Sequence, residues 1–147
     1  MLPRKRNLPA GCGLALWAAL GATTLAAQSA WEQRDSGTTA NLWGFSGGVA
    51  VGEQGVILTT SDQGATWTRR FSGTTAWLTA VNYDSQLKRY TVVGEGGIIL
   101  SSPDGVVWTR EASPTAVRLN GVSGDGGIAV GEAGAGALTR DANGGWT

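Results

Sequence analysis

Two kinds of acidic residue recur at fixed places in this 147-residue sequence, and they are the first candidates for chemistry. Each kind occurs three times: a glutamate after a Val-Gly pair, and an aspartate a few residues before a tryptophan. These residues are Glu53, Glu95 and Glu132, and Asp62, Asp104 and Asp141. Paired carboxylates could in principle cleave a glycosidic bond, and loop aspartates could bind Ca²⁺.

Their recurrence favours a structural role for both sets. A residue that every repeat carries is a fold element first, and a Ca²⁺ loop would need several alternating Asp or Asn ligands, which are missing here. An aspartate or hydroxyl side chain can instead accept hydrogen bonds from N–H groups of its own turn. We therefore expect these carboxylates to brace turns, and we assign no catalytic, cofactor-binding or metal-binding residue and no cofactor.

The glycine-rich segments 94–97 and 131–136 could be taken for phosphate-binding loops. They lack a following Lys-Ser/Thr pair and open no helix, so hairpin turns are the better interpretation. Glycines stand at equivalent places before and after each such turn: Gly52, Gly94 and Gly131, then Gly55, Gly97 and Gly134. A tight hairpin needs positive φ there, which glycine adopts without strain.

Composition excludes several classes of function. The chain contains no histidine, so a Ser-His-Asp triad and a His-based zinc site are excluded. Its single cysteine, Cys12, lies in the N-terminal segment. Without the basic run Arg4–Arg6, 8 basic and 11 acidic side chains remain, a net charge of −3. Such a surface gives no general attraction to nucleic acid phosphates, and we expect no nucleic acid partner.

Residues 1–30 are typical of a secretory signal peptide. A basic start (Arg4–Arg6) precedes the apolar run 13–26, and small residues near Ala26 to Ala30 offer cleavage sites. The apolar run is shorter than the ~20 residues of a membrane span, although an uncleaved anchor is the alternative. We therefore expect an exported protein, periplasmic or extracellular, with no stable membrane insertion after cleavage.

The remainder, 31–147, is repetitive. The run SGTTA occurs twice at an offset of 36 residues, and the Val-Gly-Glu turn recurs after 42 and then 37 residues. A period near forty with about four short strands per unit is typical of a β-propeller blade. For the middle unit the expected strands are 78–83, 90–93, 97–101 and 107–111. We expect an outer strand at 31–36 and blades at about 41–72, 77–113 and 118–147.

Propellers usually have 4 to 8 blades, whereas this array has about three. One unit cannot bury both faces of its sheet, because stacked neighbours share the core. We therefore expect either that further blades belong to the array or that it closes by oligomerisation.

The turns before the tryptophans resemble the Asp-box, the S/T-x-D-x-G-x-T-W motif of sialidase-type BNR repeats. The second copy is one residue shorter, and the third has Asn143 at the glycine position. The matching residues are Thr60, Asp62, Gly64 and Trp67; Ser102, Asp104, Gly105 and Trp108; and Thr139, Asp141 and Trp146. In families with this motif the box lies on the outer hairpin of the blade, away from active sites.

Together with the Val-Gly-Glu-x-Gly-x-Ile-Leu segment, the repeat of 31–147 is similar to the photosystem II assembly and stability factor family of propellers. The resemblance implies an all-β propeller that binds a protein partner and has no enzymatic activity. It also implies a link to photosynthesis, and a lumenal location if the source is photosynthetic, but no residue of the chain itself points to such a source.

Function is expected where the repeat is broken. The loop 83–90 lengthens one hairpin, so we select Tyr83, Asp84, Lys88, Arg89 and Tyr90 as candidate partner-binding residues. Trp77 joins them, because Trp43, Trp77 and Arg118 stand at variable repeat positions and Trp and Arg favour interfaces. A solvated loop and tryptophans packed in the core are the alternatives.

Three hypotheses follow. The first is an exported scaffold that binds or helps assemble a partner protein. The second is a carbohydrate-active enzyme of Asp-box type, although the Arg-Ile-Pro segment expected of a sialidase does not occur. The third is a chain whose functional site belongs to blades outside this sequence.

Overall fold

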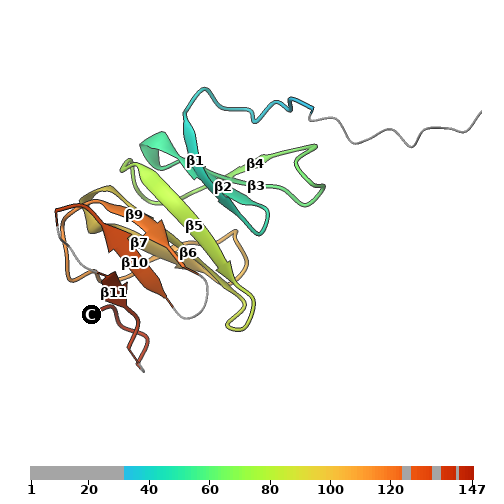
Figure 1. Ribbon diagram of the computed structural model, residues 1–147. Helices are drawn as coiled ribbons and strands as arrows, with labels where there is room; N and C mark the ends of the chain where they lie inside the picture. Colours follow the sequence, from blue (N-terminus) through green and yellow to red (C-terminus); the bar gives the residue numbers. More distant parts are fainter. Residues whose placement is uncertain (1–31, 124–126, 134–136, 142) are drawn as a thin grey trace, which may run out of the picture. The chain divides into compact units, whose positions relative to one another are not determined.

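The computed structural model describes residues 32–123, 127–133, 137–141 and 143–147. The chain divides into two compact units, Met1–Gln33 and Arg34–Thr147, and the strands all belong to the second. The predicted signal segment 1–30 lies outside the described residues. The described part is all-β, which confirms the predicted class, and its helical turns are two 3₁₀ turns (Figure 1). No helix among these residues is long and apolar enough to cross a membrane.

The strands form three antiparallel sheets, each a meander in sequence order. Sheet 1 contains β1 (Leu42–Ser46), β2 (Val49–Gly52), β3 (Ile57–Thr59) and β4 (Thr68–Arg70). Sheet 2 contains β5 (Leu78–Asp84), β6 (Arg89–Gly94), β7 (Ile99–Ser102) and β8 (Thr109–Arg110). Sheet 3 contains β9 (Leu119–Val122), β10 (Ile128–Gly131) and β11 (Ala137–Thr139).

The four strands predicted for the middle unit are all present. Their bounds differ by no more than two residues. The 3₁₀ turn η2 (Glu95–Gly97) moves the start of the third strand from Gly97 to Ile99. In sheet 1 the 3₁₀ turn η1 (Glu53–Gly55) likewise precedes β3. The short apolar runs between glycine-rich turns therefore located the strands correctly.

The strand predicted at 31–36 is not formed. Trp31 lies outside the described residues, and 32–41 contain no strand. The free edge of β11 pairs with the segment that contains Trp146 and Thr147. Thr147 exchanges two backbone hydrogen bonds with Thr139, at 2.9 and 3.0 Å, and Arg140 bridges to Trp146. Since β11 has one free edge, a second strand could not pair there as well.

The glycines around the turns fall into two groups, and the prediction was wrong for one. Gly55 and Gly97 have φ of +67° and +68°, as predicted. Gly52 and Gly94 are extended instead, with φ of −165° and −173°. A Cβ on Gly94 would collide with the carbonyl oxygen of Trp77, so close backbone approach requires this glycine.

Period-2 alternation along the second strand of each sheet builds two cores. Each sheet has two faces. The following face is the one on the side of the next sheet along the chain, and the preceding face is the opposite one. Between sheets 1 and 2, Val51 packs with Leu78, Val81 and Val92. Between sheets 2 and 3 the cluster contains Val93, Ile99, Leu119, Ala129, Leu138 and Trp146. Each fully buried aliphatic side chain stabilises the fold by about 1.5–3 kcal/mol relative to an exposed one.

Candidate functional site

Trp43, Trp77 and Arg118 form a stacked row across the starts of β1, β5 and β9. The two indole rings are stacked, with centroids 6.4 Å apart and planes 25° from parallel. The guanidinium carbon of Arg118 lies 5.8 Å from the centroid of the Trp77 ring. Trp43 and Trp77 are 50% and 39% exposed, so they are not packed in the core. We call these three residues the tryptophan row.

A β-bulge presents the first member of this row. The register between β1 and β2 shifts between Leu42 and Gly44, which leaves Trp43 out of the ladder. Bulges commonly re-aim a side chain in this way. Sheet 2 has a bulge at the corresponding place, but the residue in it is Thr79 rather than a tryptophan.

The turns after the second strands fix the backbone of the other two members. The N–H of Glu95 donates to the carbonyl of Trp77 at 2.8 Å, and the N–H of Glu132 donates to that of Arg118 at 2.9 Å. In sheet 1 the carboxylate of Glu53 also accepts from the Asn41 side-chain amide at 2.9 Å. These glutamates therefore hold the segment that enters each sheet.

Arg118 keeps part of its hydrogen-bonding capacity. Its Nη1 lies 3.9 Å from a Glu132 carboxylate oxygen, and its side chain is one-third exposed. Its Nε is buried and has no hydrogen-bond partner among the described residues. The row thus offers two exposed aromatic faces beside a cation, a surface that suits an apolar or aromatic side chain next to a carboxylate.

The two tyrosines of the predicted loop pack within the protein. Their rings lie 4.6 Å apart, and the hydroxyl of Tyr90 donates to the carbonyl of Gly47 at 2.6 Å. The N–H of Tyr83 donates to the hydroxyl of Ser46 at 3.0 Å. Burial raises the pKa of Tyr90, and the neighbouring Tyr83 adds to the increase. Both residues therefore join sheet 2 to the β1–β2 turn.

The rest of the loop closes the hairpin between β5 and β6. Asp84 is buried, and its carboxylate accepts from the N–H groups of Gln86 and Leu87 at 2.8 and 2.9 Å. Lys88 is exposed and has a φ of +50°. Trp77 precedes the opposite end of β5, so the structure separates it from the other predicted binding residues.

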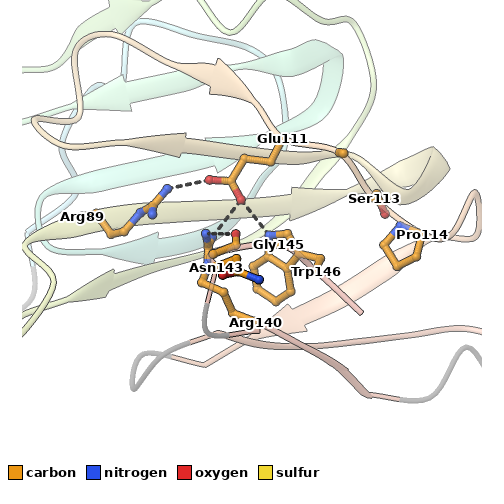
Figure 2. Close-up of a pocket in the computed structure, with 10 residues that line it drawn as sticks. Arg89, Glu111, Ser113, Pro114, Arg140, Asn143, Gly145 and Trp146 are labelled. Carbon is orange, nitrogen blue, oxygen red and sulfur yellow. Dashed lines mark hydrogen bonds and ion pairs between the residues drawn. The ribbon is translucent and has the colours of Figure 1, made fainter.

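Arg89 belongs to a charged cluster between sheets 2 and 3, centred on Glu111 (Figure 2). The carboxylate of Glu111 lies 2.5 Å from the guanidinium of Arg89 and 2.8 Å from that of Arg140. It also accepts from Nε1 of Trp146 at 2.7 Å, and Arg140 stacks on that indole ring at 4.7 Å. The net effect of these surroundings is to lower the pKa of Glu111. Burial alone would raise this pKa, but the hydrogen bonds from Ser101 and Trp146 and the charge of Arg140 outweigh burial.

A hollow of about 610 Å³ opens beside this cluster. Figure 2 shows the side chains of Arg89, Arg140 and Trp146 grouped around the carboxylate of Glu111, and all four residues line the hollow. Its other lining residues are small or polar: Ala112, Ser113, Pro114, Asn143, Gly144 and Gly145. Because Glu111 is neutralised by the two arginines, the cluster is suited to joining the sheets rather than to transferring protons.

Sequence reasoning missed Glu111 and Arg140. A signal was present, since Trp67-Thr68-Arg69-Arg70 aligns with Trp108-Thr109-Arg110-Glu111 and the charge reverses at the last position. In the structure that position faces the next sheet, because the Glu111 carboxylate contacts Arg140 and Trp146, which follow β11.

The first Asp-box is a self-contained loop. The carboxylate of Asp62 accepts from Thr66 through its hydroxyl at 2.6 Å and its N–H at 2.8 Å, and from the hydroxyl of Thr60 at 2.8 Å. These bonds, led by that of the Thr66 hydroxyl, lower the pKa of Asp62 to about 2. Gly64 has a φ of +88° and packs against the ring of Trp67.

The other two boxes repeat this arrangement with local changes. Asp104 accepts from the N–H groups of Val106 and Val107, which together with Ser102 lower its pKa. The Trp108 indole donates to the carbonyl of Gly105 at 3.1 Å. Asp141 accepts from the N–H groups of Asn143 and Gly145, both at 2.8 Å. In the third box the left-handed residue is Gly144, with φ of +84°. The remaining motif residue, Thr139, pairs through its backbone with Thr147.

Within the described part of the chain, no group of three or more acidic, histidine or cysteine side chains is placed to hold a metal ion. The comparisons add no relative, since no protein-family model, curated protein or solved structure matches the chain.

Proposed function

We propose that the protein is a non-enzymatic scaffold that binds a partner protein through the tryptophan row. The carrying observation is the stack of Trp43 and Trp77 with Arg118, exposed on a fixed backbone. Tryptophan and arginine are enriched among the residues that dominate binding energy at protein interfaces. Anchors that are already positioned lose little conformational entropy on binding, which favours affinity.

The proposal extends to the architecture. The three meander sheets, stacked in sequence order, are proposed to be blades of a β-propeller. Support comes from the repeat near forty residues and from the same strand order in all three sheets. The similarity to photosystem II assembly and stability factors implies the same scaffold role. An exported location, periplasmic, extracellular or lumenal, remains part of the proposal through residues 1–30.

The test is an affinity capture with the tagged 147-residue chain from extracts of its source, compared among three forms. These are the wild type, the double variant Trp43→Ala/Trp77→Ala, and Phe71→Ala as the matched control. Phe71 is 88% exposed and lies outside the row. We expect a partner that is recovered with the wild type and with Phe71→Ala but not with the double variant.

Each captured protein is then purified and titrated against the three forms by calorimetry. A loss of about 30-fold or more in affinity for the double variant supports the proposal, since truncating an anchor costs about 2 kcal/mol or more. Equal affinities for all three forms contradict it. Near-UV circular dichroism checks that the double variant keeps its packing.

A further inference from the structure

The following face of sheet 3 exposes side chains that sheets 1 and 2 bury. Val51, Val93 and Val130 occupy the same place in the three sheets, each before the glycine that ends the second strand. Val51 and Val93 are fully buried against the next sheet, whereas Val130 is 47% exposed. Two residues earlier, Val49 is 2% exposed and Ile128 is 47% exposed.

The preceding face of sheet 1 shows the reciprocal pattern along β1. Deeper on the same face, Ala50, Val56 and Leu58 are buried, with Ala40 and Trp67 packed against them. Leu42, Leu78 and Leu119 each begin the first strand of a sheet. Leu78 and Leu119 are fully buried against the preceding sheet, whereas Leu42 is 39% exposed. Phe45 is 62% exposed, although Val81 at the same place in sheet 2 is 8% exposed and lies in the core.

Small residues allow the first strands of neighbouring sheets to lie close together, and sheet 3 has such a residue on its exposed face. A Cβ on Gly44 would lie 3.1 Å from the Cα of Ala80, so a glycine lets β1 and β5 approach. Gly121 is the equivalent residue of β9, paired with Val130 as Gly44 is with Val51. A Cβ there would meet only Val130 of its own sheet within 4 Å. Sheet 3 therefore has the small residue that a further neighbouring strand would need.

We propose that the following face of sheet 3 binds the preceding face of sheet 1 of a second copy of this chain. The exposed residues of the two faces, Val130 and Ile128 on sheet 3 and Leu42 and Phe45 on sheet 1, correspond to residues that meet between sheets 1 and 2. The new contact continues the stack of sheets. Because the two faces differ, the association is head-to-tail, and it can close into a ring or extend.

The hydrogen-bonding pattern supports the same geometry. Where sheet 2 meets sheet 3, the hydroxyl of Thr79 donates to the carbonyl of Leu119. Asn120 stands in the corresponding bulge of sheet 3 and is exposed. Its side-chain amide can donate to the carbonyl of Leu42 in the second copy, as Thr79 does to Leu119.

The test measures the mass of the 147-residue chain by light scattering from about 1 to about 200 μM, a range that also covers weak association. A reductant excludes a disulfide through Cys12. Three variants are compared with the wild type: Val130→Glu, Phe45→Glu and the control Leu87→Glu. Leu87 is 56% exposed at the β5–β6 turn, away from both faces. We expect concentration-dependent association of the wild type and the control, and monomers of 15.1 kDa for each face variant.

Mixing the two face variants gives the decisive result. Val130→Glu keeps an intact sheet 1 face and Phe45→Glu keeps an intact sheet 3 face. A head-to-tail contact therefore predicts that the mixture forms a dimer that does not grow further, although each variant alone is monomeric. A monomeric wild type overturns the proposal. So do face variants that associate as the wild type does, or a mixture that stays monomeric.

Discussion

The indole N–H of Trp146 donates a 2.7 Å hydrogen bond to the carboxylate of Glu111, across the boundary between sheets 3 and 2. The two residues are 35 positions apart in the chain. Arg140 reinforces the contact, since it pairs with Glu111 and stacks on Trp146. One carboxylate therefore fixes the last tryptophan and the neighbouring sheet together.

Glu111→Gln should destabilise the fold. The change leaves the largely buried Arg140 without its anionic partner, which costs about 1–3 kcal/mol. Urea unfolding monitored by tryptophan fluorescence measures the loss. Glu95→Gln is the matched control, because Glu95 is exposed and should change stability by less than about 0.5 kcal/mol. Equal effects of the two variants would contradict the structural role of Glu111.

Gly94→Ala should cost more than Gly96→Ala, although only Gly96 has positive φ. Alanine at 94 would collide with the carbonyl oxygen of Trp77, whereas at 96 no atom lies within 4 Å. The equivalent of Gly96 in sheet 1 is Gln54, a non-glycine residue at φ +54°. We expect losses of about 3 kcal/mol for Gly94→Ala and about 1 kcal/mol for Gly96→Ala in urea unfolding. The reverse order would show that backbone approach does not limit position 94.

The pKa of Asp62 predicts an acid-sensitive contribution to stability. Its folded pKa of about 2 lies below the ordinary 3.8, because Thr66 and Thr60 bond its charged form. The contribution is therefore complete above pH 3.8 and is lost as the pH falls toward about 2. The difference in urea midpoint between wild type and Asp62→Asn should be constant above pH 5 and shrink between pH 4 and 2. A difference that does not change with pH would rule this out.

Tyr90→Phe should lower stability by about 1 kcal/mol, because it removes the 2.6 Å hydrogen bond to Gly47 that joins sheet 2 to sheet 1. Thermal unfolding checks this, with Phe71→Leu as a control, because the Phe71 side chain is 88% exposed. If Tyr90→Phe leaves stability unchanged while it weakens partner capture, the loop 83–90 is a binding surface rather than a sheet contact.

Features set by residues close together in the sequence could be predicted, whereas features set by contacts between distant residues could not. Apolar runs and turn glycines located the strands of the middle unit, because both signals lie within a few residues. The roles of Gly94 and Gly55 could not be separated, since both stand beside apolar runs. Gly55 has positive φ and Gly94 is extended, and the carbonyls that approach them belong to Thr74 and Trp77, well away in the sequence. For the same reason Trp77 was selected without its stacking partner, and the pairing of Glu111 with Arg140 spans 29 residues.

Every strand in the three sheets pairs only with its neighbours in sequence. The strand pairings are therefore local, because each hairpin closes a short loop before distant segments need to meet. Folding can therefore begin in any one of the three sheets and spread to the adjacent ones. The same independence lets a duplication or deletion of one unit change the length of the array without disturbing the pairing of the others.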